Sequence, residues 1–226
     1  MAAHVTLDRV ELFLGSAQFH FDGTIDAGTI TAVTGRSGAG KSTLINLIAG
    51  FAMPDAGKVM IGGQDMTGLH VSRRPLTLVF QDNNLFSHLD IFTNVALGIS
   101  ATMRLFPEDR QRIDNALVRV GLDGFGKRMP ATLSGGERQR VAFARALVRE
   151  RPILLLDEPF AALDPEMRAE MVKLLLELHQ ETGNTVIMVS HEPDEMNAIA
   201  ESRIIVENGR FLAGVEKSST HFSKES

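Results

Sequence analysis

The stretch Gly35-Arg36-Ser37-Gly38-Ala39-Gly40-Lys41-Ser42 decides how the rest of the chain is interpreted. It follows the pattern glycine, four residues, glycine, lysine and serine or threonine, which is typical of a phosphate-binding loop. Its glycines let the backbone turn so that several N–H groups face one anion, and the following helix adds its positive end. An apolar run precedes the loop at 30–34, and a helical pattern closed by Gly50 follows it. The stretch therefore predicts an α/β fold with a phosphate site between a strand and a helix.

The polar side chains of this loop have expected tasks. Lys41 is expected to reach the β- and γ-phosphates of a nucleotide, and the Ser42 hydroxyl to bind Mg²⁺. The alternative is a glycine-rich turn with a surface lysine. The residues predicted to bind the nucleotide here are Gly35, Ser37, Gly38, Ala39, Gly40, Lys41, Ser42 and Thr43.

Four apolar runs share one feature, a set of polar residues directly after their last apolar position. The runs span residues 30–34, 76–80, 153–156 and 185–189. The residues that follow them are Gly35, Gln81, Asp157 with Glu158, and Ser190 with His191. None of the runs alternates cleanly between apolar and polar residues, as expected for strands buried on both faces of a parallel sheet. If the four strands are neighbours, their carboxyl ends deliver these residues to one crevice.

Asp157 and Glu158 carry the chemistry expected of this crevice. Asp157 is suited to hold Mg²⁺ through water, and Glu158 is suited to act as general base toward an attacking water. An acidic pair at a strand end can also simply cap the next helix. Pro159 directly after the pair and the phosphate loop upstream favour the catalytic interpretation.

A second anion-binding feature is predicted at Leu133-Ser134-Gly135-Gly136-Glu137. Ser134 and Glu137, three residues apart, form the pattern of a capping box at the start of a helix. The two glycines leave backbone N–H groups uncovered at the positive end of that helix, so an anion can bind there. A plain helix cap explains the same residues from local chemistry alone.

The composition limits the classes of protein. A chain of 226 residues with a net charge of −5 predicts one large α/β domain and no nucleic-acid partner. The arginine-rich segment 138–151 is interpreted as a solvated helix face. The absence of cysteine excludes disulfides and thiolate metal sites. Neither a secretion signal nor an apolar stretch of ~20 residues is evident, so contact with a membrane is expected only through a partner.

Changes of pattern along the chain predict its subdivisions. Residues 1–86 and 152–216 are expected to form the sheet core, with 5–25 in a small antiparallel sheet. Residues 87–151 show helical patterns broken by proline and glycine, which indicates a helical subdomain inserted into the core. The polar tail 217–226 is expected to be flexible.

Taken together, these motifs resemble those of the ABC (ATP-binding cassette) ATPases. The segment Leu133-Ser134-Gly135-Gly136-Glu137-Arg138-Gln139-Arg140 is similar to the signature motif of that family. The other motifs are similar in kind and in order, and they are the loop at Gly35, Gln81, Asp157-Glu158, Ala162-Leu163-Asp164 and His191. The resemblance extends from about Leu7 to Gly214. It implies a P-loop fold with a mostly parallel sheet core, an N-terminal antiparallel β subdomain and an inserted α-helical subdomain.

The resemblance also implies how the chain assembles around ATP and Mg²⁺. Two ATP molecules would lie in a head-to-tail homodimer, between the phosphate loop of one subunit and the signature helix of the other. Ser134, Gly135 and Gly136 would then contact the nucleotide held by the partner. Gln81 would sense Mg²⁺ and the attacking water, and His191 would contact the γ-phosphate.

The chain departs from the family at the adenine. The family usually stacks a tyrosine or tryptophan on this base, yet the sequence contains neither. Phe13 stands near the expected place and is the candidate, with an ordinary core residue as the alternative. A second departure, Arg36 in place of a common proline, is expected to be tolerated because its side chain points away from the phosphates.

Within the family, a cassette without fused membrane helices or a second cassette is typical of bacterial importers. The segments Ser72–Leu89 and Arg151–Asp164 are especially similar to the ATP-binding subunits of thiamine importers. This implies an ATPase attached peripherally to integral-membrane permease subunits at the cytoplasmic face of the inner membrane, docking through the surface around 81–89. A periplasmic substrate-binding protein would be an indirect partner. Importers of iron, polyamines or anions, and cassettes for lipoprotein release or cell division, are the alternatives.

Overall fold

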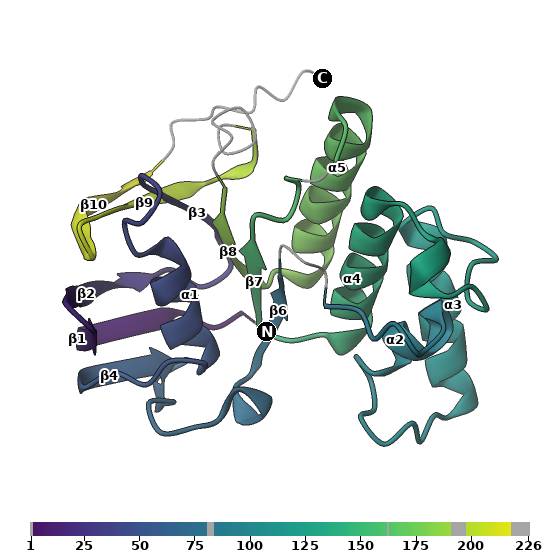
Figure 1. Ribbon diagram of the computed structural model, residues 1–226, viewed down its shortest axis with the longest axis horizontal. Helices are drawn as coiled ribbons and strands as arrows, with labels where there is room; N and C mark the ends of the chain where they lie inside the picture. Colours follow the sequence, from purple (N-terminus) through teal and green to yellow (C-terminus); the bar gives the residue numbers. More distant parts are fainter. Residues whose placement is uncertain (1, 81–83, 162, 191–197, 218–226) are drawn as a thin grey trace.

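The structure, a computed structural model, describes residues 2–80, 84–161, 163–190 and 198–217, with only the backbone described for 213–217. The strands within these residues form one sheet in the order β5-β4-β1-β2-β10-β9-β3-β8-β7-β6 (Figure 1). Their bounds are Val5–Leu14 (β1), Ala17–Ile25 (β2), Ile30–Thr34 (β3), Ala56–Ile61 (β4), Gln64–Asp65 (β5), Leu76–Val79 (β6), Ile153–Asp157 (β7), Thr185–Val189 (β8), Ser202–Glu207 (β9) and Arg210–Lys217 (β10).

Helices lie on both sides of this sheet. Figure 1 shows α1 beside the β1, β2 and β4 end, and α4 and α5 on the other side of β6 and β7. Helices α2 and α3 lie farther out, beyond α4. The helices span Lys41–Ala49 (α1), Ile91–Ala96 (α2), Pro107–Arg119 (α3), Gly135–Arg149 (α4) and Pro165–Thr182 (α5), and short 3-10 turns lie at Val71–Arg73 and Pro130–Thr132.

The four strands predicted from apolar runs are adjacent in the sheet. β3 pairs in parallel with β8, β8 with β7, and β7 with β6. β8 is buried along its whole length, and β3 and β7 are buried up to their last residue. The expectation of parallel strands buried on both faces is therefore confirmed. Their carboxyl ends share one edge of the sheet, which is the condition for the predicted crevice.

Side chains of the parallel strands alternate between two apolar cores. Ile153 and Leu155 pack on one face of the sheet, in a cluster that also contains apolar residues of α1 and of the N-terminal strands. Leu154 and Leu156 pack on the other face with residues of α4 and α5. The sheet thus separates two apolar cores, with α1 packed on one face and α4 on the other.

The N-terminal segment differs in part from the expectation. β1 pairs antiparallel with β2 and with β4, as predicted for 5–25. These strands are not a separate sheet, however, because β2 also pairs with β10 between His20 and Arg210. β10 pairs antiparallel with β9, which lies parallel to β3, so the two parts are continuous. β9 and β10 form a hairpin through Asn208-Gly209, a dipeptide typical of such turns. The pairing of β10 with β2, in contrast, joins segments far apart in sequence, and no local motif indicates it.

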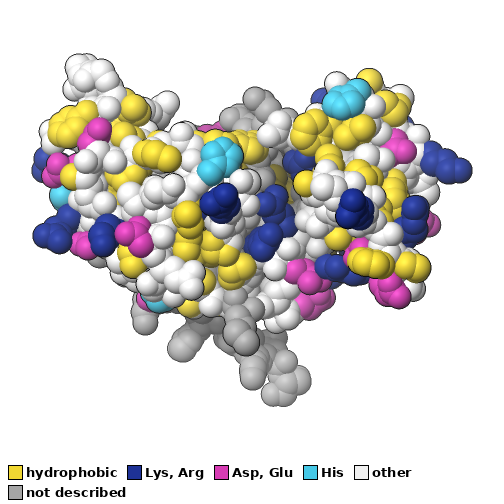
Figure 2. All heavy atoms as spheres, turned by 90° about the horizontal axis from the view of Figure 1, so that it is seen from below, with side chains coloured by type: hydrophobic (Ala, Val, Ile, Leu, Met, Phe, Trp, Pro, Cys, Tyr) yellow, Lys and Arg dark blue, Asp and Glu magenta, His cyan; other side chains and the backbone are white. Residues whose placement is uncertain are grey.

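The lower surface of the molecule is hollowed between the sheet half and the helical half. Figure 2 shows hydrophobic and basic side chains along this hollow. A cleft of about 330 Å³ lies here, and its lining includes Phe51, Phe86, Arg145 and Arg149. Among the described residues, no helix is both long enough and apolar enough to cross a membrane.

Arg74 caps the C-terminal end of α1. Its side chain is buried and donates hydrogen bonds to the carbonyl oxygens of Leu47 and Ile48, at 2.6 and 2.8 Å. It also donates to the carbonyl of Leu69, at 3.0 Å. The guanidinium therefore supplies donors to unpaired carbonyls in the last turn of α1 and places a positive charge at the negative end of the helix. Burial lowers the pKa of Arg74, and the charge of Asp65 acts in the opposite direction.

We predict that Arg74→Met lowers the free energy of unfolding by about 2–4 kcal/mol, because buried carbonyl oxygens lose their donors. Urea unfolding followed by circular dichroism measures this loss. The neighbouring exposed arginine gives a matched control, and Arg73→Met should change stability by less than about 0.5 kcal/mol. Equal effects of the two substitutions would contradict a special role for Arg74.

Candidate functional site

The predicted phosphate-binding loop connects β3 to α1. Gly35 adopts φ 146°, and a Cβ atom at this position would collide with the carbonyl oxygen of Val206 in β9. Gly38 adopts φ 76°, and a Cβ there would meet no atom of the described residues within 4 Å, so these residues leave the crest of the loop open. The loop therefore needs glycine at Gly35 to pass β9 and leaves room for an anion above Gly38.

Lys41 is the first residue of α1 and is only 6% exposed. Its Nζ donates hydrogen bonds to the carbonyl oxygens of Gly35, at 2.8 Å, and Arg36, at 3.0 Å. Burial lowers the pKa of Lys41, while the negative charges of Glu158 and Asp157 act to raise it. The ammonium group thus lies in the loop and within the electrostatic reach of the carboxylates that follow β7.

The carboxylate pair is anchored to the sheet by backbone pairing. Asp157 is the last residue of β7 and lies opposite Val189 of β8. The Glu158 N–H donates to the Val189 carbonyl at 2.9 Å, so the pairing continues one residue beyond the strand. The structure therefore brings together the loop, Lys41 and both carboxylates at one sheet edge. Gln81 and His191, predicted for the same crevice, lie outside the described residues.

The donor set at this edge fits Mg²⁺. Ser42 follows Lys41 and is exposed, and Asp157 supplies a carboxylate from β7. No group of three or more His, Cys, Asp or Glu side chains in the described part of the chain could hold a metal by itself. Mg²⁺ typically binds one or two protein oxygens together with substrate phosphates and several waters. One hydroxyl and one carboxylate beside a phosphate loop suit that mode of binding.

Glu158 has an unusual backbone conformation. Its φ is 48°, in the left-handed region that residues other than glycine rarely adopt. The hydrogen bond to Val189 holds it there. Strained residues of this kind cost about 1–3 kcal/mol and gather at functional sites. The conformation turns the chain sharply between β7 and Pro159.

The helix α4 begins with the capping box that the sequence predicts. Ser134 Oγ accepts from the Glu137 N–H at 3.2 Å, and Glu137 Oε2 accepts from the Ser134 N–H at 2.7 Å. The bond to the Ser134 N–H is the main reason why the pKa of Glu137 is lowered. Gly136 packs so closely against Met167 of α5 that a Cβ would not fit. A Cβ at Gly135 would have, among the described residues and apart from its own helix backbone and chain neighbours, only the end of Arg138 within 4 Å. The turn therefore combines a fixed cap with an accessible backbone.

The Phe13 side chain lies on the face of β1 opposite that of Leu12. It lies on β1 opposite Gln18, and its side chain is 52% exposed, which excludes the alternative of a core residue. The neighbouring pair Leu12 and Phe19 occupies the other face of these strands, because paired residues share a face and successive residues alternate. The ring of Phe19 lies against Gly40, 2.9 Å from a Cβ built at that glycine. Phe19 is therefore an aromatic residue beside the loop, and the family resemblance that selected Phe13 could not reveal which face of the strand each ring occupies.

A further residue that the sequence reasoning missed is Asn94 of α2. Its side chain is fully buried and accepts from the Phe86 N–H at 2.8 Å. It donates to the carbonyl oxygens of Phe86 at 3.1 Å, Leu89 at 3.0 Å and Asp90 at 3.0 Å. One amide thus fixes the loop 86–90, which borders the cleft between the two halves. The sequence feature that could have indicated this role is a single asparagine within the mostly apolar segment of α2.

Comparison with known proteins identifies the family. Residues 19–161 match the family described as ABC transporter. A thiamine import ATP-binding protein, ThiQ, of Rhizobium meliloti is 55% identical over 90% of this chain and 86% of its own length. ThiQ of Brucella abortus is 50% identical over 94% of this chain and 88% of its own length. The chain belongs to the ABC transporter family.

Solved structures agree with this assignment. The ATP-binding cassette MJ0796, in a dimeric post-hydrolysis state bound to ADP and Pi, superposes with a TM-score of 0.84. It is 31% identical, and the match covers 96% of this chain and 99% of that one. The cassette MJ1267 in its ADP conformation has a TM-score of 0.83 at 22% identity, which supports the fold alone. The predicted P-loop ABC fold is confirmed.

We predict that Glu158→Gly is more stable than Glu158→Ala by about 1 kcal/mol, because a left-handed backbone is strained at alanine but not at glycine. Urea unfolding of both variants measures the difference. The same two substitutions at Glu170, an exposed position inside α5, are the control. There the order should reverse, with glycine less stable by about 1 kcal/mol. Equal stabilities at Glu158 would show that its backbone is not strained.

Proposed function

We propose that this chain is the ATP-binding and ATP-hydrolysing subunit of a bacterial importer for thiamine or thiamine phosphates. The observation that carries the chemistry is the shared sheet edge, where Lys41 lies in the loop and within reach of the charges of Asp157 and Glu158. Relatives named thiamine import ATP-binding proteins, 50–55% identical over at least 90% of the chain, support the substrate.

Each residue at this edge has a task in ATP hydrolysis. The open loop and the positive end of α1 bind the phosphates, and Lys41 exchanges its two carbonyl acceptors for phosphate oxygens. Ser42 and Asp157 would hold Mg²⁺, which would neutralise charge on the phosphates. Glu158, fixed by its bond to Val189, orients the attacking water and accepts its proton. Gln81 and His191 are assigned their tasks by the family resemblance alone.

The second half of each nucleotide site comes from another copy of the chain. Helix α4 lies on the side of the sheet opposite α1, so its first turn is suited to reach a nucleotide on a partner. Ser134, Gly135 and Gly136 present accessible backbone there. The related cassette MJ0796 is described as dimeric in a state bound to ADP and Pi. A head-to-tail homodimer in which bound ATP bridges the subunits follows.

The cleft in the lower surface is the surface proposed to contact the integral-membrane permease. It has apolar side chains, including the exposed Phe86, beside the basic side chains of Arg145 and Arg149. Asn94 keeps the loop at its border rigid, so movement of the helical half is passed on to a bound partner. The subunit would thereby lie on the cytoplasmic face of the membrane. A periplasmic substrate-binding protein would reach it only through the permease.

The first test of this function is Glu158→Gln. Loss of the general base should lower phosphate release by at least about 100-fold, while ATP still binds and favours the dimer. Phosphate release and size-exclusion chromatography with ATP measure the two effects. Glu170→Gln, at an exposed position of α5, is the control and should hydrolyse ATP at the normal rate. Normal turnover of Glu158→Gln would contradict the assignment of the base.

The second test concerns the membrane partner and the substrate. In vesicles that contain the permease, thiamine-loaded binding protein should stimulate ATP hydrolysis, and Phe86→Ala should reduce that stimulation several-fold without weakening ATP binding. Phe106→Ala is the matched control, because Phe106 is also exposed but does not line the cleft. Stimulation by an iron- or polyamine-loaded binding protein instead would overturn thiamine as the substrate. An unchanged response of Phe86→Ala would count against the docking surface.

A further inference from the structure

One face of α4 forms part of the lower cleft, the cleft of about 330 Å³ between the sheet half and the helical half. Ala142, Arg145, Ala146 and Arg149 line it, and residues with this spacing share one face of a helix. Because alanine side chains are small, a bound segment has room to approach the helix beside the two arginines. The described lining is otherwise neutral, and its aromatic residues are Phe51, Phe80 and Phe86.

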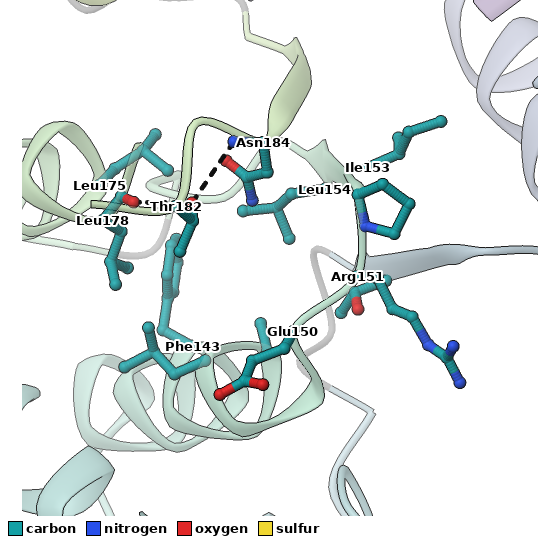
Figure 3. Close-up of a pocket in the computed structure, with 13 residues that line it drawn as sticks. Phe143, Glu150, Arg151, Ile153, Leu154, Leu175, Leu178, Thr182 and Asn184 are labelled. Atoms are coloured by element: carbon teal, nitrogen blue, oxygen red, sulfur yellow. Dashed lines mark hydrogen bonds between the residues drawn. The ribbon is translucent and has the colours of Figure 1, made fainter. Parts of the chain in front are cut away.

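The two positive charges have no acidic counterpart in the described lining of the cleft, which contains neither aspartate nor glutamate. Arg149 is part-buried and makes no hydrogen bond or ion pair within the described residues. Arg145 donates to the neutral carbonyl of Asn84 at 3.0 Å. Glu150, directly after Arg149, borders a separate cavity beside the start of β7 (Figure 3) and is bonded to Arg112 at 2.8 Å. The carboxylate nearest to Arg149 in sequence is therefore already paired elsewhere.

These charges destabilise the free chain at this face of α4. Burial lowers the pKa of Arg145, and the charge of Arg149 lowers it further. Burial also lowers the pKa of Arg149, and the charge of Arg151 adds to this effect. A guanidinium group stays charged in proteins, so the cost of burial and the repulsion between like charges both remain. An anion bound between the two arginines would offset both.

We infer that the permease segment entering this cleft carries an aspartate or glutamate whose carboxylate binds between Arg145 and Arg149. This carboxylate belongs to the partner of the docking surface proposed above, on which the inference rests. Side chains four residues apart on a helix have Cβ atoms about 5–6 Å apart, so one carboxylate can accept hydrogen bonds from both arginines. Apolar side chains that flank the acidic residue would pack against Phe51 and Phe86.

The shape of this surface favours a protein segment over a lipid headgroup. Both arginines line a hollow between the two halves of the molecule, and Figure 2 shows basic and hydrophobic side chains along that hollow. A bilayer presents its headgroups on a nearly flat surface, so it reaches such a hollow less well than a projecting segment does. The chain also has a net charge of −5, and an anionic membrane repels it as a whole.

The first test measures binding of the whole chain to the permease held in nanodiscs of phosphatidylcholine, a lipid without net charge. Arg149→Met removes the charge and keeps an apolar side chain. It should weaken binding at least about tenfold, the effect of one lost charged hydrogen bond, and binding should depend less on salt between about 50 and 500 mM NaCl. Arg210→Met, at an exposed position of β10 outside the cleft lining, is the control and should bind like the unchanged chain. Equal binding by Arg149→Met and the unchanged chain would overturn the inference.

Exchange of charges tests for the carboxylate. Arg149→Glu should weaken binding by at least about 100-fold, because it places like charges together. Lysine is then substituted, one position at a time, for each aspartate and glutamate in the cytoplasmic segments of the permease, and one of these variants should restore binding. Failure of every variant to restore binding would contradict a carboxylate partner. Binding to permease-free nanodiscs of phosphatidylglycerol that depends on Arg149 would also contradict it, since the arginines would then serve an anionic lipid.

The stability of the free chain separates this role from a structural one. Without the permease, Arg149→Met should leave the midpoint of urea unfolding unchanged or raise it, because it removes an uncompensated charge. A clear fall in the midpoint would show that contacts within the chain use Arg149, and the inference would fail. If Phe86→Ala weakens binding and Arg149→Met does not, the cleft still docks the permease and only the carboxylate is wrong. If neither substitution weakens binding, the docking surface proposed above fails as well.

Discussion

The hydrogen bond from the Glu158 N–H to the Val189 carbonyl, 2.9 Å long, fixes the geometry on which the site depends. It extends the parallel pairing of β7 and β8 beyond Asp157 and sets Glu158 against the end of β8. β8 pairs in turn with β3, and the loop begins directly after β3. Glu158, Asp157 and the loop after β3 are thus positioned by one run of backbone pairing. Because the sheet positions these groups before a ligand binds, the arrangement does not require long, flexible side chains to become ordered on binding.

The same edge explains the environment of Lys41. A buried ammonium is costly in isolation, and here two loop carbonyls accept its hydrogen bonds while two carboxylates lie within electrostatic reach. These groups offset part of the cost of burying the ammonium group, and a phosphate can replace the neutral carbonyls as a stronger acceptor. At the other end of α1, Arg74 compensates the helix carbonyls, so both ends of this short helix are held by buried cations. The nucleotide loop is therefore supported from both ends of its helix.

Much of this arrangement could be predicted from the sequence, and the reason is local chemistry. Apolar runs without polar alternation identified the four parallel strands, and the spacing of Ser134 and Glu137 identified the start of α4. The assignment of Phe13 illustrates the limit. The family resemblance placed an aromatic candidate on this strand pair, but only the structure shows that the ring of Phe19 lies against Gly40. Arg74 and Asn94 were missed for a related reason, since their partners are backbone carbonyls that leave no pattern in the sequence.

Helix α4 connects the parts of the molecule that the sheet keeps apart. At about 1.5 Å per residue, Gly135–Arg149 extends for roughly 22 Å from the capped turn at Ser134 to a cavity of about 270 Å³ beside the start of β7. Between these ends, Ala146 lines both that cavity and the lower cleft, and so does Thr77 of β6. A change in the packing of Ala146 or Thr77 therefore alters both the cavity and the cleft, which lie on either side of the contact between α4 and β6. The first turn of α4 is packed tightly against α5, because a Cβ at Gly136 would collide with Met167, so a shift of α4 at this end requires α5 to shift or repack.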